Sequence, residues 1–357
     1  MQAGATSGDL AGPAHAYGLA LSTGDASSVG LGGLATGGGI GWFVRKYGLT
    51  ADRLRSAVVV TAGGEILRAS PTEHPDLLWA IRGGGGNFGI VVEFEFQLVP
   101  VSFVHAGALV LPLSREVVRG YLDYALCAPD ELTTISAIGF APPAPFIPED
   151  RVGEPSLLIL AVWVGDREEG DRALEPLRNL APAIADTIGS IPYPAMFEYT
   201  VPASAPHGAA LRSMFTNEIP DSAIDEMIAS LAAATSPVSM VQIRPLGGQL
   251  ARIDRDSTAF VHRDKNFLIA VLGLWLEEND NGDAHRNWVE TLWSKIEHIR
   301  DGVYSNFLGV EGEARTREAY SESVYRRLAE VKAVYDPDNV FRYNQNIRPQ
   351  QVQQQAA

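Results

Sequence analysis

The sequence predicts an α+β fold in which an antiparallel sheet supplies most of the later strands. Segments with helical and with strand patterning follow one another without the regular spacing of βαβ units. The first hundred residues are rich in glycine and hold only short β-prone stretches. The chain has 357 residues, and single cores stop growing at about 250–300 residues, so we expect more than one domain.

The first region holds three short predicted strands and one helix. The strands are expected at residues 57–61, 66–69 and 90–98. A helix is expected at residues 75–82, because Leu77, Leu78 and Ile81 would share one helical face. The region ends at Val99-Pro100.

Longer helices and strands alternate from Val104 onward. Helices are expected at residues 114–128 and 221–234, and strands at residues 157–164, 239–244 and 267–275. A final helix is expected at residues 316–335 and must stop at Asp336-Pro337, since proline cannot continue it. An extended tail follows at residues 339–349, and residues 350–357 are expected to be disordered.

Composition excludes several classes of function. The formal net charge of -15 argues against nucleic-acid binding, which needs clustered Lys and Arg. The one cysteine, Cys127, rules out a disulfide framework and a thiolate metal site, and we expect it to be packed. No apolar run is long enough to span a bilayer, and no secretory signal opens the chain as written. We therefore expect a cytoplasmic protein without membrane partners.

Two glycine clusters, residues 30–42 and 82–89, are the densest signal in the chain. Glycines let backbone N–H groups approach an anion or a flat ring, although glycine-rich turns also occur in crowded cores. Gly84, Gly86 and Gly89 satisfy G-x-G-x-x-G, yet this motif follows a helix and opens a strand, which is the wrong context for a Rossmann site. Neither cluster has a P-loop ending, and no G-x-S-x-G elbow indicates a hydrolase.

Several ordered motifs extend over essentially the whole chain. They are Gly-Gly-Gly-Ile-Gly-Trp at 37–42, Arg-Lys-Tyr-Gly-Leu-Thr-Ala-Asp at 45–52, the run at 75–91, Thr-Ala-Phe-Val-His-Arg at 258–263, Tyr-Ser-Asn-Phe at 304–307 and the closing segment at 335–347. Together these motifs resemble the berberine-bridge-enzyme-like oxidoreductases. The resemblance implies a PCMH-type FAD-binding domain packed on an α+β substrate domain. The second part of the FAD-binding domain would cover residues 1–101, and the substrate domain would cover residues 102–300. A C-terminal segment at residues 301–357 would return to the FAD-binding domain.

The resemblance also implies chemistry and site residues. The protein would use FAD to oxidise a small organic alcohol, amine or related substrate, with oxygen as electron acceptor. Residues near the flavin and its phosphates would be Gly24, Ser28, Gly30, Gly33, Gly37, Gly38 and Gly39; Gly89 and Val91 would lie near the adenine half; Tyr304, Asn306, Asn344 and Asn346 would approach the ring system. An asparagine amide suits a flavin edge because it both donates and accepts; backbone capping of an extended tail is the alternative for Asn344 and Asn346.

The chain departs from the family pattern at both attachment points for the flavin. The family's first subdomain, with its phosphate loop and flavin-linked histidine, does not precede Gln2 here, which suggests a truncated product, a late start assignment or a descendant that lost it. The slot for a second, cysteinyl bond aligns with Ala26. Any flavin would therefore be non-covalent. A flavin-free protein that binds a small molecule or performs non-redox chemistry is the alternative, and the uncovered surface would favour a homodimer.

Acid-base residues are few. Relatives often carry a base on the strand at residues 267–275, which is apolar on both faces here. Tyr304 is the first candidate near the reacting centre, with a core aromatic as the alternative. His262 is the second candidate, although a surface or ion-paired histidine is the more ordinary interpretation beside Arg263 and Asp264.

Overall fold

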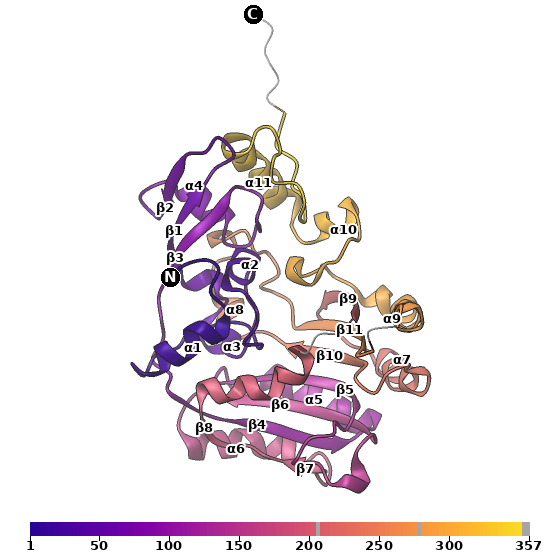
Figure 1. Ribbon diagram of the computed structural model, residues 1–357. Helices are drawn as coiled ribbons and strands as arrows, with labels where there is room; N and C mark the ends of the chain where they lie inside the picture. Colours follow the sequence, from indigo (N-terminus) through magenta and orange to yellow (C-terminus); the bar gives the residue numbers. More distant parts are fainter. Residues whose placement is uncertain (205–207, 278–279, 352–357) are drawn as a thin grey trace, which may run out of the picture.

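The computed structural model describes residues 1–204, 208–277 and 280–351 and contains two antiparallel sheets with helices around them (Figure 1). The α+β fold with an antiparallel sheet, predicted from the sequence, is confirmed. The disorder expected at the chain end falls mostly on residues 352–357, which lie outside the described residues.

The smaller sheet has three strands in the order β2-β1-β3 and packs against helices from both ends of the chain. The elements are β1 (Leu54–Val60), β2 (Ile66–Ala69), β3 (Ile90–Phe96), α4 (Pro75–Ala80), α10 (Glu313–Glu318) and α11 (Glu322–Tyr335). Ala57 and Val59 of β1 pack in one core with Leu77 of α4 and Leu328 of α11. The last helix therefore completes the core that the first hundred residues begin.

The larger sheet has eight strands, in the order β7-β4-β6-β5-β10-β11-β9, with β8 also paired to β4. Its strands are β4 (Phe103–Pro112), β5 (Leu132–Phe140), β6 (Pro155–Trp163), β7 (Ala185–Asp186), β8 (Gly189–Pro192), β9 (Gly208–Thr216), β10 (Met240–Pro245) and β11 (Phe267–Trp275). Every pairing recorded in this sheet is antiparallel.

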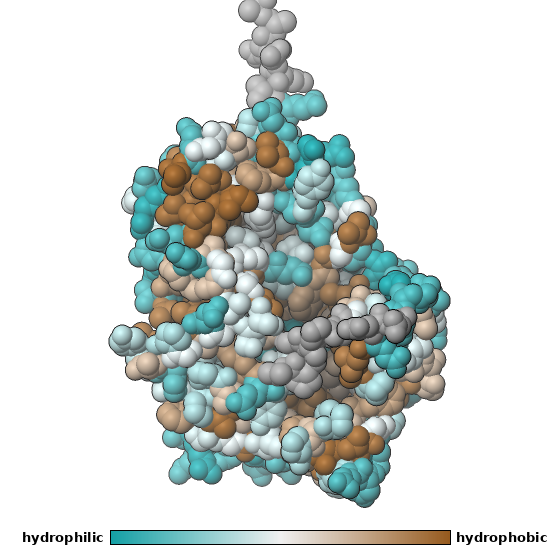
Figure 2. All heavy atoms as spheres, viewed as in Figure 1, coloured by the Kyte–Doolittle hydropathy of each residue, from teal (hydrophilic) through white to brown (hydrophobic). Residues whose placement is uncertain are grey.

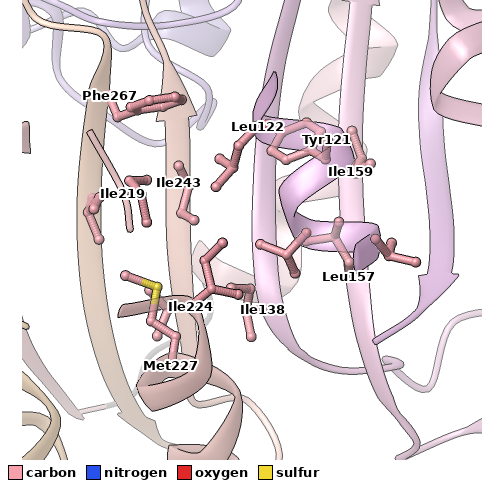
Figure 3. Close-up of a cluster of buried hydrophobic side chains, with 14 of the residues drawn as sticks. Tyr121, Leu122, Ile138, Leu157, Ile159, Ile219, Ile224, Met227, Ile243 and Phe267 are labelled. Carbon is pink, nitrogen blue, oxygen red and sulfur yellow. The ribbon is translucent and has the colours of Figure 1, made fainter. Parts of the chain in front are cut away.

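One face of the larger sheet is covered by helices. They are α5 (Arg115–Cys127), α6 (Arg167–Arg178), α7 (Asp221–Ser230) and α9 (Asp283–Ile296). Leu122 of α5 and Met227 of α7 pack with Ile159 and Ile243 of the strands in one hydrophobic core (Figure 3). The sequence of α5 explains why it forms a helix that packs on the sheet. Ser114 caps its first turn by accepting a hydrogen bond from the Val117 N–H, and its apolar residues recur at helical spacing.

The opposite face of the larger sheet faces the glycine-rich first region. That region holds α1 (Ser7–His15), α2 (Leu31–Thr36) and α3 (Val44–Tyr47), and α8 (Gln249–Arg252) lies beside α3. Leu268 of β11 and Phe215 of β9 pack there with Ile40 and Tyr304. The side chains of β10 and β11 that alternate away from the helical core therefore point toward the glycine clusters.

Two expectations need correction. The final helix is two helices, α10 and α11, because Ser321 accepts a hydrogen bond from the Val324 N–H and starts a new helix. The second of these helices, α11, ends at Tyr335, as Pro337 predicts. Cys127 is exposed rather than packed, since it lies in the last turn of α5 on its outer side. Several elements, β4 and α9 among them, were not singled out from the sequence.

Candidate functional site

The segment formed by residues 24–33, here called the glycine loop, combines open space with free backbone donors. Ser28, Gly30 and Gly33 are exposed, and a Cβ at Gly30 or Gly33 would meet no atom within 4 Å. Gly30 precedes α2 without a side-chain cap. Among the described residues, the N–H groups of Gly32 and Gly33 have no acceptor, as expected in the first turn of a helix. This loop can therefore donate to an external anion.

Gly37, Gly38 and Gly39 are buried, and protein side chains already fill the space beside them. A Cβ at Gly37 would lie 2.0 Å from the Asn306 Oδ1, and one at Gly39 would lie 2.2 Å from the Thr50 hydroxyl oxygen. Gly38 and Gly39 have φ angles of 124° and 87°, which only glycine adopts readily. Backbone geometry and close packing account for these three glycines, and Gly24 is likewise buried against Leu34.

Tyr304 joins the end of α2 to the C-terminal segment. Its side chain is buried, and its phenol oxygen accepts hydrogen bonds from the Gly39 N–H at 2.9 Å and from the Asn306 Nδ2 at 3.0 Å. Burial raises the pKa of the phenol and outweighs the N–H donors, which lower it. The Asn306 amide also donates to the Leu34 carbonyl while remaining exposed. Asn306 thus presents an amide beside Gly37, with Tyr304 fixed behind it.

His262 is enclosed by aromatic rings. It is 7% exposed, stacks on Phe215 with ring centroids 4.6 Å apart, and lies against Gly302. Its Nε2 lies 3.1 Å from the Glu318 carbonyl oxygen, to which a neutral imidazole can donate. Burial, with a smaller effect from Lys265, lowers the pKa of His262 to about 4. The expectation of a surface histidine is wrong; His262 is neutral near pH 7 and well packed.

The C-terminal tail at residues 339–349 lies against the second glycine cluster. The Asn344 Nδ2 donates to the Gly86 carbonyl at 2.9 Å, and the Asn346 Oδ1 lies 3.3 Å from the Lys332 Nζ. Lys332 and Asp336 are both fully buried and 3.3 Å apart. Lys332 also contacts Asn87 and the Phe341 carbonyl. A buried ion pair therefore anchors the tail.

The second glycine cluster also contacts α2, because the N–H groups of Gly83 and Gly85 both donate to the Thr36 carbonyl. Gly89 directly precedes β3, and a Cβ there would meet Val59 and the Val60 backbone; Val91 is half-buried within the strand. The structure thus brings α2, Tyr304, Asn306 and the tail into one region. It places Val91 on the smaller sheet and Gly89 at the start of its strand β3.

Sequence reasoning missed a buried polar cluster that connects the glycine loop to β10. Arg244 is 5% exposed; its Nη2 donates to the Asp25 carboxylate at 2.9 Å, and its Nε donates to the Gln242 Oε1 at 2.9 Å. Its guanidinium lies over the Phe307 ring, 5.2 Å from the centroid. The strand at residues 239–244 was predicted, and the alternation of Gln242 and Arg244 with Val241 and Ile243 was the signal that could have found it.

The part of the larger sheet around this cluster forms an apolar floor. Met240, Leu272 and Leu211 lie in one row across β10, β11 and β9, and all three are half-buried. Ala137 and Ala270 flank Gln242 in the next row. The face drawn in Figure 2 is hollowed between the smaller sheet with α11 above and the larger sheet below.

Two family models match the chain at its two ends. The first, described as "FAD binding domain", matches residues 1–70, and the second, described as "Berberine and berberine like", matches residues 303–348. An FAD-linked oxidoreductase of Bacillus subtilis, itself uncharacterised, is 32% identical over 359 residues, which cover 98% of this chain and 77% of the relative. The chain belongs to the berberine-bridge-enzyme-like family of FAD-linked oxidoreductases.

Other relatives in the family have named activities. The (R)-6-hydroxynicotine oxidase of Paenarthrobacter nicotinovorans is 29% identical over 365 residues, which cover 97% of this chain and 76% of the relative. The crystal structure of 6-hydroxy-D-nicotine oxidase from Arthrobacter nicotinovorans matches with a TM-score of 0.83 at 26% identity, covering 98% of this chain and 78% of that chain. The PCMH-type fold is confirmed, and membership of this family makes the protein an FAD-linked oxidoreductase.

FAD is the cofactor of this family, and the residues present fit part of it. The unpaired N–H groups of Gly32 and Gly33 suit a phosphate, because Gly33 and the neighbouring Gly30 border open space. The Asn306 side chain belongs to an exposed residue but donates both amide hydrogens within the protein, so its Oδ1 is the atom left to accept from the polar edge of a flavin ring. Ala26 has only a methyl group, so no cysteinyl bond can form at that position.

Metal-ligand clusters and membrane-spanning helices are both absent from the described part of the chain. No group of three or more His, Cys, Asp or Glu there could hold a metal ion. None of the helices in the same residues is both long and apolar enough to cross a membrane.

Proposed function

We propose that the protein oxidises a small organic alcohol, amine or related centre with FAD that is not covalently bound, and passes the electrons to oxygen. The observation that carries the proposal is the glycine loop: free backbone donors lie beside open space, and Asp25 of the same loop pairs with Arg244 on β10 of the larger sheet. When bound, FAD supplies a ring that accepts a hydride from the substrate. Two relatives are named as oxidases, the (R)-6-hydroxynicotine oxidase and a chitooligosaccharide oxidase, which supports oxygen as acceptor.

Within this proposal each residue has a distinct task. The amides of Gly32 and Gly33 bind a cofactor phosphate, Asn306 orients the ring edge, and the apolar floor excludes water from the substrate. Tyr304 is the proposed residue nearest the reacting centre, and its phenol stays protonated at neutral pH. The enclosed setting of His262 supports a packing role.

The division of the chain at residues 101 and 300 remains a proposal. Two observations support it: β4 starts the larger sheet at Phe103, and Val303 rejoins the core of the smaller sheet. Limited proteolysis would test it, since cleavage should fall at these junctions before it reaches either sheet.

Self-association is also a proposal, supported by an apolar face on the smaller sheet. Ile66 and Ile90 both pair with Val60 and are 73% and 55% exposed. Light scattering on the purified protein should give the mass of a dimer, and Ile66→Lys with Ile90→Lys should give a monomer. A monomeric mass for the wild-type protein would refute the proposed self-association.

Flavin retention tests the proposed function directly. The chain is incubated with FAD, passed over gel filtration and examined by visible absorbance; we expect flavin to co-elute with it. Gly33→Asp places a carboxylate where the anion would bind and should abolish retention by repulsion. Gly12→Asp is a matched control, because Gly12 is also an exposed helical glycine with open space at its Cβ. A folded but colourless wild type would instead support a flavin-free binding protein.

A further inference from the structure

The polar cluster of Arg244, Asp25 and Gln242 holds one cation at a fixed position on the otherwise apolar floor. Arg244 belongs to β10, and its register partner on β11 is Leu268. Its guanidinium cannot swing away, because Asp25 and Gln242 hold its Nη2 and Nε while its flat face lies on the Phe307 ring. A rigid planar cation of this kind is suited to directional recognition of a carboxylate.

One end of this guanidinium is free. Among the described residues, the Nη1 group of Arg244 has no hydrogen-bond acceptor, and it is not among the fully enclosed polar atoms that lack a partner. Phe307, on which the guanidinium lies, is half-buried, and the Gln242 side chain is half-buried as well. A ligand on the floor can therefore reach the free Nη1 donors, while the Oδ2 atom of Asp25 is engaged by the same guanidinium.

The surroundings make this donor the dominant polar feature of the floor. Met240, Leu272 and Leu211 form one row beside it, and alanines flank Gln242 in the next row. A mainly apolar molecule can cover these side chains, and its polar group then meets Arg244. A protonated amine at the same place would face the cation and lose its own hydration, which is unfavourable.

We propose that Arg244 is a substrate-recognition residue and that the substrate is a mainly apolar small molecule carrying a carboxylate rather than a free amine. The proposal rests on the proposed function only where it calls the bound molecule a substrate, the molecule that is oxidised. Benzoate and benzylamine are matched probes, because they share a ring and differ in the sign of the charge. Binding of each to the full chain, with and without FAD, is measured by titration calorimetry.

Two variants and one control complete the test. Arg244→Met should weaken benzoate binding about tenfold or more, as expected for a lost hydrogen bond to a charged group. Because Arg244→Met leaves Asp25 without its partner, the double variant with Asp25→Asn keeps the cluster neutral and should show the same loss. Arg252→Met removes an exposed arginine and should leave benzoate binding unchanged. Circular dichroism verifies that each variant is folded.

The outcomes are distinct from those for flavin retention. Wild-type protein should bind benzoate at least about tenfold more tightly than benzylamine. Tighter binding of benzylamine, equal benzoate binding by folded Arg244→Met, or no saturable benzoate binding would each overturn the proposal. A chain that binds benzoate through Arg244 but retains no FAD would refute the proposed function and leave the role of Arg244 standing.

Discussion

The ion pair between Lys332 and Asp336 gives the sharpest prediction about what holds the C-terminal tail in place. Both side chains are fully buried, and the Lys332 Nζ also lies within hydrogen-bond distance of Asn87, Asn346 and the Phe341 carbonyl. Lys332→Met fits a similar volume but removes the cation. It leaves a buried carboxylate unpaired, for which we expect a loss of about 3–5 kcal/mol in the free energy of unfolding.

Urea unfolding followed by tryptophan fluorescence measures this loss, and limited proteolysis shows whether the tail detaches first. Adding Asp336→Asn removes the uncompensated charge, so the double variant should recover part of the stability. Asp336 also accepts hydrogen bonds from the N–H groups of Val340 and Phe341, so recovery should be incomplete. Arg326→Met, an exposed change on the same helix, should stay within about 0.5 kcal/mol of wild type. A Lys332→Met protein as stable as this control would refute the reasoning.

Three further predictions follow from single contacts. Folding lowers the pKa of His262 from 6.5 to about 4, so as pH falls the unfolded chain binds a proton at this residue before the folded chain does. The contribution of His262 to the free energy of unfolding is therefore fully present above pH 6.5 and is lost toward pH 4, by up to about 3 kcal/mol. His262→Gln should accordingly show a shallower pH dependence of stability in urea unfolding. Tyr304→Phe leaves the buried Gly39 N–H without its acceptor and should cost about 1–3 kcal/mol in thermal unfolding; an unchanged Tm would contradict this. Gly38→Ala forces a Cβ to within 2.9 Å of Phe260 at a φ of 124°, so it should destabilise the protein by at least about 1–3 kcal/mol, and a soluble variant of unchanged stability would exclude that strain.

Local patterns predicted the secondary structure where one physical signal dominated. Phe267–Trp275 is a strand at the bounds expected from its apolar run, and α11 ends where Asp336-Pro337 forbids a helix. The start of α11 was missed, because Ser321 reads as an ordinary helical residue until its side chain is seen to accept from Val324. A helix N-cap depends on one side-chain hydrogen bond, and the hydrophobic periodicity of the sequence does not reveal that bond.

The site was harder to predict, because contacts between residues far apart in the sequence determine which of its residues are buried, exposed or paired. The resemblance directed attention to the glycines, but the sequence could not tell exposed Gly33 from Gly39, whose Cβ space Thr50 occupies. Arg244 meets Asp25 across 219 positions of the chain, and His262 is buried by Phe215 and Gly302, which are also distant in sequence. Such packing depends on the register of β9, β10 and β11, which no local pattern specifies.

The release of flavin by acid tests most directly the claim that this chain holds FAD without a covalent bond. Protein loaded with FAD and freed of excess cofactor by gel filtration is precipitated with trichloroacetic acid, and flavin absorbance is measured in the pellet and in the supernatant. We predict that flavin co-elutes with the folded protein and then appears entirely in the supernatant. Folded protein that elutes without flavin, or flavin that stays in the pellet, would contradict the account.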